Sequence, residues 1–166
     1  MEVIILAIQL TAKESMLLKD QKSAEELCVK KYQTYANQAQ DPQLKQLFSS
    51  LAQKEQEHLN TINQILNGQV PNVQQGQSGQ QQTQIGQQMQ QKKPAMQNPQ
   101  AKENDKTLCE DMLSMEKYVS GTYDTTIFET TNTNIRQALN HIQKEEQEHG
   151  EQIFNYMQSN GMYSVQ

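Results

Sequence analysis

The chain has 166 residues, enough for one domain with a sizeable core, and we predict a single domain over residues 1–166. Its net charge of −5, without a basic stripe interleaved with aromatic residues, argues against a nucleic-acid partner. The two cysteines, Cys28 and Cys109, form no Cys-x-x-Cys pair, which excludes a cysteine-ligated metal site and a disulfide scaffold. Both fall on apolar helix faces, where reduced cysteine serves as a small hydrophobe.

The first ten residues are apolar but too short to span a membrane. They contain Glu2 and lack the basic head and the cleavage site of a signal peptide. We therefore expect a packed leader segment, no membrane insertion and an intracellular protein.

A first helical hairpin is predicted over residues 11–67. Thr11 and Glu14 have the form of a capping box, which predicts the start of a helix. Asp41-Pro42 combines an N-cap with proline at the first helical position, so the chain turns and a second helix begins there. Apolar residues recur at spacings of three and four along both helices, and the second helix is expected to end near Gly68.

A long crossover is predicted over residues 68–105. The stretch 67–105 contains 14 Gln, three of the four Pro and four of the seven Gly. Such a connection is needed if the helices on either side of it run parallel, because it must then travel the whole bundle, roughly 40 Å. A flexible coil of this length reaches on the order of 35 Å, and more when it is stretched.

A second hairpin is predicted over residues 106–160. Thr107 and Glu110 repeat the form of a capping box and predict the start of a third helix. Thr130–Asn134 is expected to be a turn, and the fourth helix should end near Asn160-Gly161. The predicted fold is all-α, a ferritin-like four-helix bundle of two antiparallel hairpins joined by one long crossover.

The two predicted hairpins are repeats of one another. Setting residues 18–66 over 109–157 without a gap gives 11 identities in 49 positions. In each half one Glu is followed thirty residues later by Glu-x-x-His, the ligand pattern of two metal ions in a four-helix bundle. The six residues are Glu25, Glu55 and His58 in the first half, and Glu116, Glu146 and His149 in the second.

The position of these residues on the helix faces supports a buried metal site more strongly than the motif alone does. Glu55 and His58 occupy two positions of the apolar stripe of their helix, and the other four residues also lie on inward faces. Four carboxylates buried together are costly, and they repel one another. Two divalent cations would remove that cost, with Glu25 and Glu116 either bridging or terminal. Oxygen and imidazole ligands suit two Fe or two Mn ions, with Zn as a substitute. The alternative is a metal-free polar or water-filled core.

Tyr32 and Tyr123 follow Glu25 and Glu116 by seven residues, on the same helix faces. They are either core aromatics whose hydroxyls need a partner, or hydrogen-bond donors to the ligand carboxylates. His141 lies away from the apolar stripe and is expected to be solvated.

The second half, from Leu108 to the end, resembles the Coat F domain of bacterial spore coat proteins. The resemblance rests on Glu116-Lys117 with Tyr123 six residues on, an acidic stretch ending in His149, and the ending Asn160–Tyr163. The first half, from Leu10 to Gly68, is similar to the same domain less distinctly. The resemblance implies a ferritin-like fold, a place in the spore coat, and other coat proteins or self-association as partners. It supplies no reaction.

The ligand pattern also resembles that of ferritin-like di-metal proteins such as rubrerythrins and bacterioferritins, which implies that the six Glu and His residues hold two metal ions. No Cys-x-x-Cys pair is available for a rubredoxin-type iron, and no fifth helix follows Gly161, which disfavours iron storage. The sequence favours a coat protein with a di-metal site. The alternatives are a di-metal oxidase, peroxidase or catalase-like enzyme that protects against reactive oxygen, and a metal-free structural coat protein.

Overall fold

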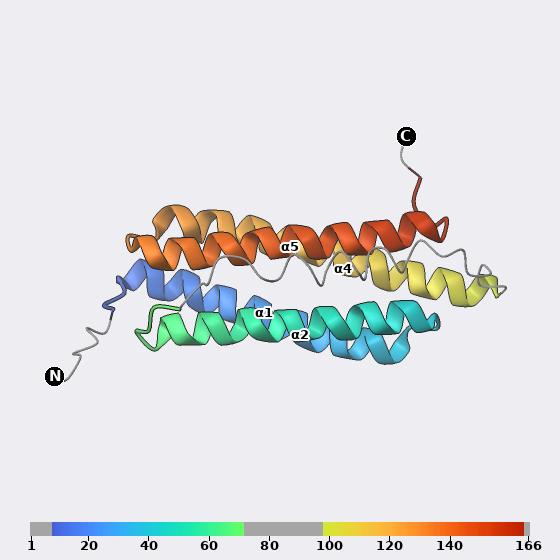
Figure 1. Ribbon diagram of the computed structural model, residues 1–166, viewed down its shortest axis with the longest axis horizontal. Coiled ribbons are helices and arrows are strands. Elements are labelled where there is room, and N and C mark those ends of the chain that lie inside the picture. Colours follow the sequence, from blue (N-terminus) through green and yellow to red (C-terminus); the bar gives the residue numbers. More distant parts are fainter. Residues whose placement is uncertain (1–7, 72–97, 165–166) are drawn as a thin grey trace.

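The computed structural model describes residues 8–71 and 98–164. These residues form four long helices that pack along their length as two hairpins (Figure 1). The predicted all-α four-helix bundle is confirmed. The helices are α1 (Ala12–Gln38), α2 (Pro42–Leu66), α4 (Pro99–Glu129) and α5 (Thr133–Ser159).

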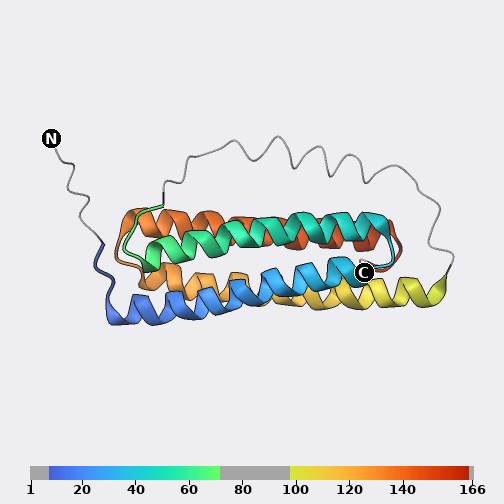
Figure 2. The same cartoon turned by 90° about the horizontal axis from the view of Figure 1, so that it is seen from below.

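The order of the helices in space explains the long connection. Helix α1 packs against α2 and α4, and α5 packs against α4 and α2, so α2 and α4 lie on a diagonal. Helix α2 ends at one end of the bundle and α4 begins at the other, and the two run parallel (Figure 2). The end of α2 and the start of α4 therefore lie at opposite ends of the bundle, as predicted, and residues 72–97 lie outside the described residues.

Local signals set the ends of the first hairpin as predicted. The Thr11 side chain accepts a hydrogen bond from the backbone N–H of Glu14, and the Glu14 carboxylate accepts one from the backbone N–H of Thr11, which is a complete capping box. Asp41 caps α2 ahead of Pro42. Gly68 follows α2 with a φ of 76°, a conformation that favours glycine.

Helix α4 begins earlier than predicted. The start expected at Thr107 is wrong, because Asn98-Pro99 supplies the same combination of N-cap and proline that starts α2. The Thr107 hydroxyl instead donates to the backbone carbonyl of Glu103 within the helix. Residues 99–105, which the sequence assigned to the crossover, are therefore helical, and the second hairpin starts before residue 106.

The other predicted boundaries hold with small changes. The turn between α4 and α5 is shorter than expected, because Asn132 already caps α5. Gly161, with a φ of 62°, follows α5 as predicted. Of the leader, Ile8 packs partly against the core and donates its backbone N–H to the carbonyl of Gly68, while residues 1–7 lie outside the described residues.

The hydrophobic core is divided into two clusters. One contains Tyr32, Phe48 and Tyr156, and the other contains Leu18 and Ile142. Cys109 belongs to the first cluster and Cys28 to the second, and both are buried free thiols, as expected. The predicted Glu and His residues belong to neither cluster, and they interrupt the apolar faces of the helices that supply both.

Each hairpin has one buried carboxylate that accepts hydrogen bonds from the turn of the other hairpin. Glu14 of α1 accepts hydrogen bonds from the backbone N–H of Thr131 at 2.7 Å and from its hydroxyl at 2.9 Å. Asp105 of α4 accepts from the backbone N–H groups of Gln40 at 2.8 Å and Asp41 at 2.9 Å. Glu14 and Asp105 are 91 residues apart, which is the offset of the internal repeat. The repeat thus extends to a reciprocal clamp that sequence analysis missed.

The clamp predicts a pH-dependent loss of stability in Glu14→Gln. Burial alone would raise the pKa of Glu14, but hydrogen bonds from Thr131 and Thr11 lower it to about 2 from 4.5. Because the folded-state pKa is depressed, the carboxylate stabilises the fold above pH 4.5 and loses this effect as the pH falls toward 2. We expect urea unfolding at pH 7 to show a loss of about 1–3 kcal/mol that shrinks at lower pH.

The control is Glu129→Gln at the same end of the bundle. Glu129 pairs with Lys13 at 2.7 Å, but both side chains are largely exposed. Its replacement should cost less than about 1 kcal/mol. Equal losses in the two variants at pH 7 would contradict the assignment of Glu14 as a clamp.

Candidate metal centre

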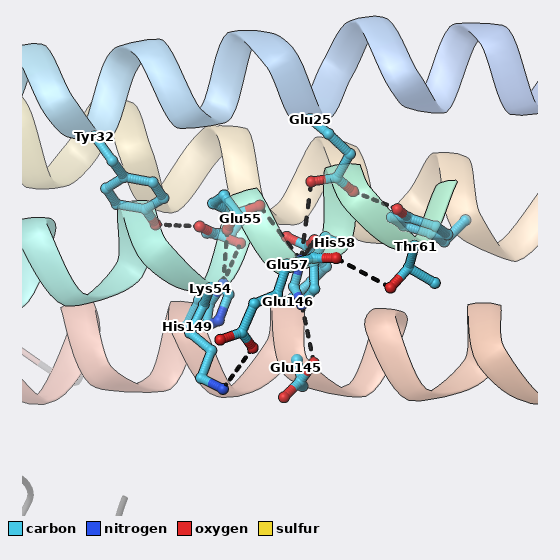
Figure 3. A network of polar contacts seen from close by, with 12 residues as sticks. Glu25, Tyr32, Lys54, Glu55, Glu57, His58, Thr61, Glu145, Glu146 and His149 are labelled. Atoms are coloured by element: carbon cyan, nitrogen blue, oxygen red, sulfur yellow. Dashed lines mark hydrogen bonds and ion pairs between the residues drawn. The ribbon is translucent and has the colours of Figure 1, made fainter. Parts of the chain in front are cut away.

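Four glutamates and two histidines meet in the middle of the bundle, between the two hydrophobic clusters. Every helix contributes, because Glu25 comes from α1, Glu116 from α4, and one Glu-x-x-His pair each from α2 and α5. Figure 3 shows Glu25 and the two Glu-x-x-His pairs close together. All six residues are at most 2 % exposed. The structure therefore brings together all six residues that the sequence singled out: Glu25, Glu55, His58, Glu116, Glu146 and His149.

The six side chains form two overlapping groups. Within each group, every residue offers one ligand atom, and these atoms lie within 4.8 Å of one another. Glu55 and Glu146 belong to both groups. The first group is completed by Glu25 and His58, and the second by Glu116 and His149. The geometry thus defines two neighbouring positions that share two carboxylates.

The hydrogen bonds of the centre cross between the two hairpins. His58 Nδ1 lies 3.0 Å from Glu146 Oε1, and His149 Nδ1 lies 2.8 Å from Glu55 Oε1. The residues in each pair come from opposite halves, and the two pairs are related by the repeat. Within its own half each histidine has a longer contact, 3.4 Å from His58 Nδ1 to Glu55 Oε2 and 3.7 Å from His149 Nδ1 to Glu116 Oε2.

The two tyrosines follow the same crossed pattern. Tyr32 of α1 donates its hydroxyl to Glu116 of α4, and Tyr123 of α4 donates to Glu25 of α1. Both rings are fully buried. Each tyrosine therefore orients the carboxylate of the opposite half, which is the second of the two alternatives that the sequence left open.

Several buried polar atoms of the centre have no hydrogen-bond partner. Each of the four glutamates has one such oxygen, Oε2, and His149 has its Nε2. Unpartnered carboxylate oxygens in a buried site are costly, since desolvation is not offset by a hydrogen bond. Buried carboxylate oxygens that lack a hydrogen-bond partner are the atoms that a cation would use.

The pKa values show how strongly the carboxylates oppose one another. Burial, followed by the charge of Glu55, raises the pKa of Glu25 and of Glu146 well above the usual value. Burial would also raise the pKa of Glu55, but hydrogen bonds from His149 and His58 lower it. Burial would lower the pKa of His149, but hydrogen bonds to Glu116 and Glu55 raise it to about 9.

A fifth carboxylate supports one of the two histidines. His58 Nε2 lies 3.0 Å from Glu145 Oε2, so both ring nitrogens of His58 face carboxylates. The residue equivalent to Glu145 in the first half is Lys54, whose ammonium group pairs with Glu57 at 2.9 Å. The two histidines are therefore supported differently, a difference that Lys54 and Glu145 already indicate in the sequence. Nothing in the sequence places Glu145 beside His58.

His141 lies outside the centre, as expected. Its side chain is 43 % exposed, and its Nε2 is 3.5 Å from Glu145. It belongs to neither group of candidate ligands. Its contact with Glu145 links the surface to the side chain that supports His58.

Comparison with known families gives one match. Residues 104–166 match the Coat F domain. The match confirms the resemblance of the second half to that domain, covers less than half of the chain, and includes Glu116, Glu146 and His149. Searches of curated proteins and of solved structures return no match. No helix in residues 8–71 and 98–164 has an apolar stretch long enough to cross a membrane.

The opposed carboxylates predict that Glu25→Gln stabilises the metal-free protein at high pH. Because the folded-state pKa of Glu25 lies above its unfolded value, the ionised carboxyl lowers stability as the pH rises above 4.5. Glutamine is a neutral replacement of the same shape. We expect urea unfolding after chelator treatment to show a gain of about 1–3 kcal/mol at pH 8 and a smaller gain at pH 5.

Glu57→Gln is the control for this measurement, because it also removes one carboxylate but from a side chain that is 65 % exposed. Its replacement should change stability by less than about 1 kcal/mol. A Glu25→Gln variant less stable than wild type at pH 8 would show that the metal-free centre tolerates the ionised carboxylate.

Proposed function

We propose that this chain is a ferritin-like component of a spore coat that holds a carboxylate-bridged pair of Fe or Mn ions in the bundle core. The observation that carries the proposal is the set of four buried glutamate oxygens without partners, one from each helix, at the point where candidate ligand atoms converge. The match of residues 104–166 to the Coat F domain supports the coat assignment. Its partners would be other coat proteins or further copies of this chain.

The arrangement favours a particular distribution of ligands. Glu25 and His58 would hold one ion, and Glu116 and His149 would hold the other. Glu55 and Glu146 belong to both groups and would bridge the two ions, so Glu25 and Glu116 are terminal ligands. Four carboxylates balance two divalent cations, which offsets the repulsion among the glutamates.

The donor set favours Fe or Mn as the resident metal. It offers carboxylate oxygens and imidazole nitrogens, and both cysteines lie outside the two groups of candidate ligands. Carboxylate and imidazole ligands with open positions suit Fe and Mn, and Zn can replace them. Burial raises the pKa of the Cys28 thiol, and nearby carboxylates raise it further, so Cys28 stays a neutral thiol.

The surrounding residues would hold the ligands in place. Tyr32 and Tyr123 fix one oxygen of Glu116 and of Glu25, which leaves the other oxygen directed toward the centre. Glu145 fixes the orientation of the His58 ring from behind. The hydrophobic clusters on both sides exclude water. A bound pair of Fe or Mn ions would supply electron transfer to a small oxidant.

Metal content tests the proposal directly. Tag-free protein purified without chelator should contain about two Fe or Mn ions per chain by mass spectrometry, whereas Glu55→Gln/Glu146→Gln should lose both ions, because the two replaced residues are the proposed bridges. Circular dichroism should show an unchanged helical fold in the variant.

Glu57→Gln/Glu148→Gln is the matched control. It removes the same number of carboxylates from the sequence Glu-Gln-Glu-His, which stands at 55–58 and again at 146–149, but at side chains that are 65 % and 31 % exposed. This variant should retain both ions. Folded wild-type protein that takes up no metal after reconstitution with Fe²⁺ and with Mn²⁺ would leave a metal-free structural coat protein.

The two adjacent positions also favour a second candidate function, an oxidase, peroxidase or catalase-like activity that removes reactive oxygen. Two redox-active ions that share Glu55 and Glu146 as ligands would lie side by side, which is the arrangement that two-metal catalysis uses. Hydrogen peroxide turnover by the metal-loaded protein should then fall to the level of free metal in Glu55→Ala and in His149→Ala. Retention of both ions without turnover would contradict an enzyme and leave the coat protein with a di-metal site.

A further inference from the structure

The two histidines of the candidate metal centre differ in what lies at their Nε2 atoms. His58 turns Nδ1 toward Glu146 at 3.0 Å, and its Nε2 lies 3.0 Å from Glu145 Oε2 (Figure 3). His149 also turns Nδ1 toward the candidate ligands, 2.8 Å from Glu55 Oε1. Its Nε2, however, is buried and has no hydrogen-bond partner among the described residues. Only one of the two imidazole rings therefore has a carboxylate on the side away from the centre.

The internal repeat explains why the second carboxylate is missing. Lys54 and Glu145 occupy equivalent positions, directly before the Glu-x-x-His pair of each half. An ammonium group donates hydrogen bonds and accepts none, so Lys54 cannot serve His149 as Glu145 serves His58. Lys54 pairs instead with the exposed Glu57 at 2.9 Å. The difference between the two histidines thus follows from one position of the repeat.

A carboxylate at Nε2 makes an imidazole a better metal ligand through Nδ1. It accepts the Nε2 proton, which fixes the tautomer that leaves the Nδ1 lone pair free, and it raises the basicity of the ring. Loss of such a partner weakens metal binding about 10- to 100-fold. Glu145 suits this role because its side chain is only 9 % exposed, so water does not displace the contact with His58.

We propose that the two metal positions have unequal affinity, and that the position with His58 binds the first ion and the position with His149 binds the second. This inference rests on the proposed function, because it concerns the same two ions. Glu145 is then a positioning residue, since it acts on the metal only through His58. The two positions share Glu55 and Glu146, so the first ion uses negative charge that the second ion also needs, which increases the difference.

Anaerobic titration of the chelator-treated full chain with Fe²⁺, in competition with a coloured chelator, measures the affinities. Wild-type protein should bind two ions with dissociation constants that differ about 10- to 100-fold. His58→Ala should abolish the tighter constant, and His149→Ala should abolish the weaker one. These two variants assign each constant to one position.

Variants at the two equivalent positions test the cause of the inequality. Glu145→Leu removes the acceptor and should weaken the tighter constant to the level of the other. Glu145→Gln, whose amide oxygen still accepts a hydrogen bond, should lie between Glu145→Leu and wild type. Lys54→Glu copies the second half and should tighten only the weaker constant, about tenfold. Lys54→Leu removes the charge without adding an acceptor and should tighten that constant less.

The outcomes separate this inference from the proposed function. Two Fe²⁺ ions bound with a single constant, or two constants that no Glu145 variant changes, would overturn the inference and leave the di-metal site in place. Loss of the weaker constant in His58→Ala would do the same. Folded protein that binds neither Fe²⁺ nor Mn²⁺ would overturn both. If Glu145→Leu does not fold, Lys54→Glu decides, because a weaker constant that stays unchanged there excludes the role assigned to the carboxylate.

Discussion

The burial of four carboxylates at one level of an apolar bundle is the constraint on which the rest of the structure depends. Carboxylates in such surroundings are unfavourable unless hydrogen bonds or cations compensate them. Two tyrosines and two histidines provide part of the compensation, yet one oxygen of each glutamate still lacks a partner. Packing alone does not account for this arrangement, because each of these positions could hold an apolar side chain.

The internal repeat arranges these contacts in a crossed pattern. In each half, the buried tyrosine, the histidine and the clamp carboxylate form a hydrogen bond with a residue of the other half. Each of these contacts therefore occurs twice, once in each direction. The halves differ where a contact need not be reciprocal. Lys54 of the first half is equivalent in the repeat to Glu145 of the second half, and Lys31 and Tyr35 are equivalent to Thr122 and Thr126. The six candidate ligands are therefore arranged nearly symmetrically, whereas the residues around them differ between the halves.

The parts of the fold that local signals determine could be predicted from the sequence. The capping box at Thr11 and the Asp41-Pro42 pair correctly predicted where α1 and α2 begin. The apolar register correctly placed Glu55 and His58 in the core. Asn98-Pro99 carries the same signal as Asp41-Pro42, but the surrounding glutamines and prolines concealed it.

Contacts between distant residues could not be predicted in the same way. Glu14 was assigned to a capping box, and nothing in its neighbourhood indicates its bond to Thr131, 117 positions away. Asp105 was placed in a crossover rather than a helix, so its bonds to the first turn were out of reach. The crossed pairing of Tyr32 with Glu116 depends on how the hairpins dock, which periodicity within one helix does not report.

The crossed contacts have a consequence for the order of folding. They join residues separated by 64 to 117 positions, so they form only after a long loop has closed. Each hairpin can assemble from nearby residues. In an isolated hairpin, however, the glutamates, the histidine and the tyrosine would be exposed and would lack the hydrogen-bond partners that the other hairpin supplies. Docking of the two hairpins is therefore the step at which cooperativity arises, and a chain with one half unfolded gains little from the other half being formed.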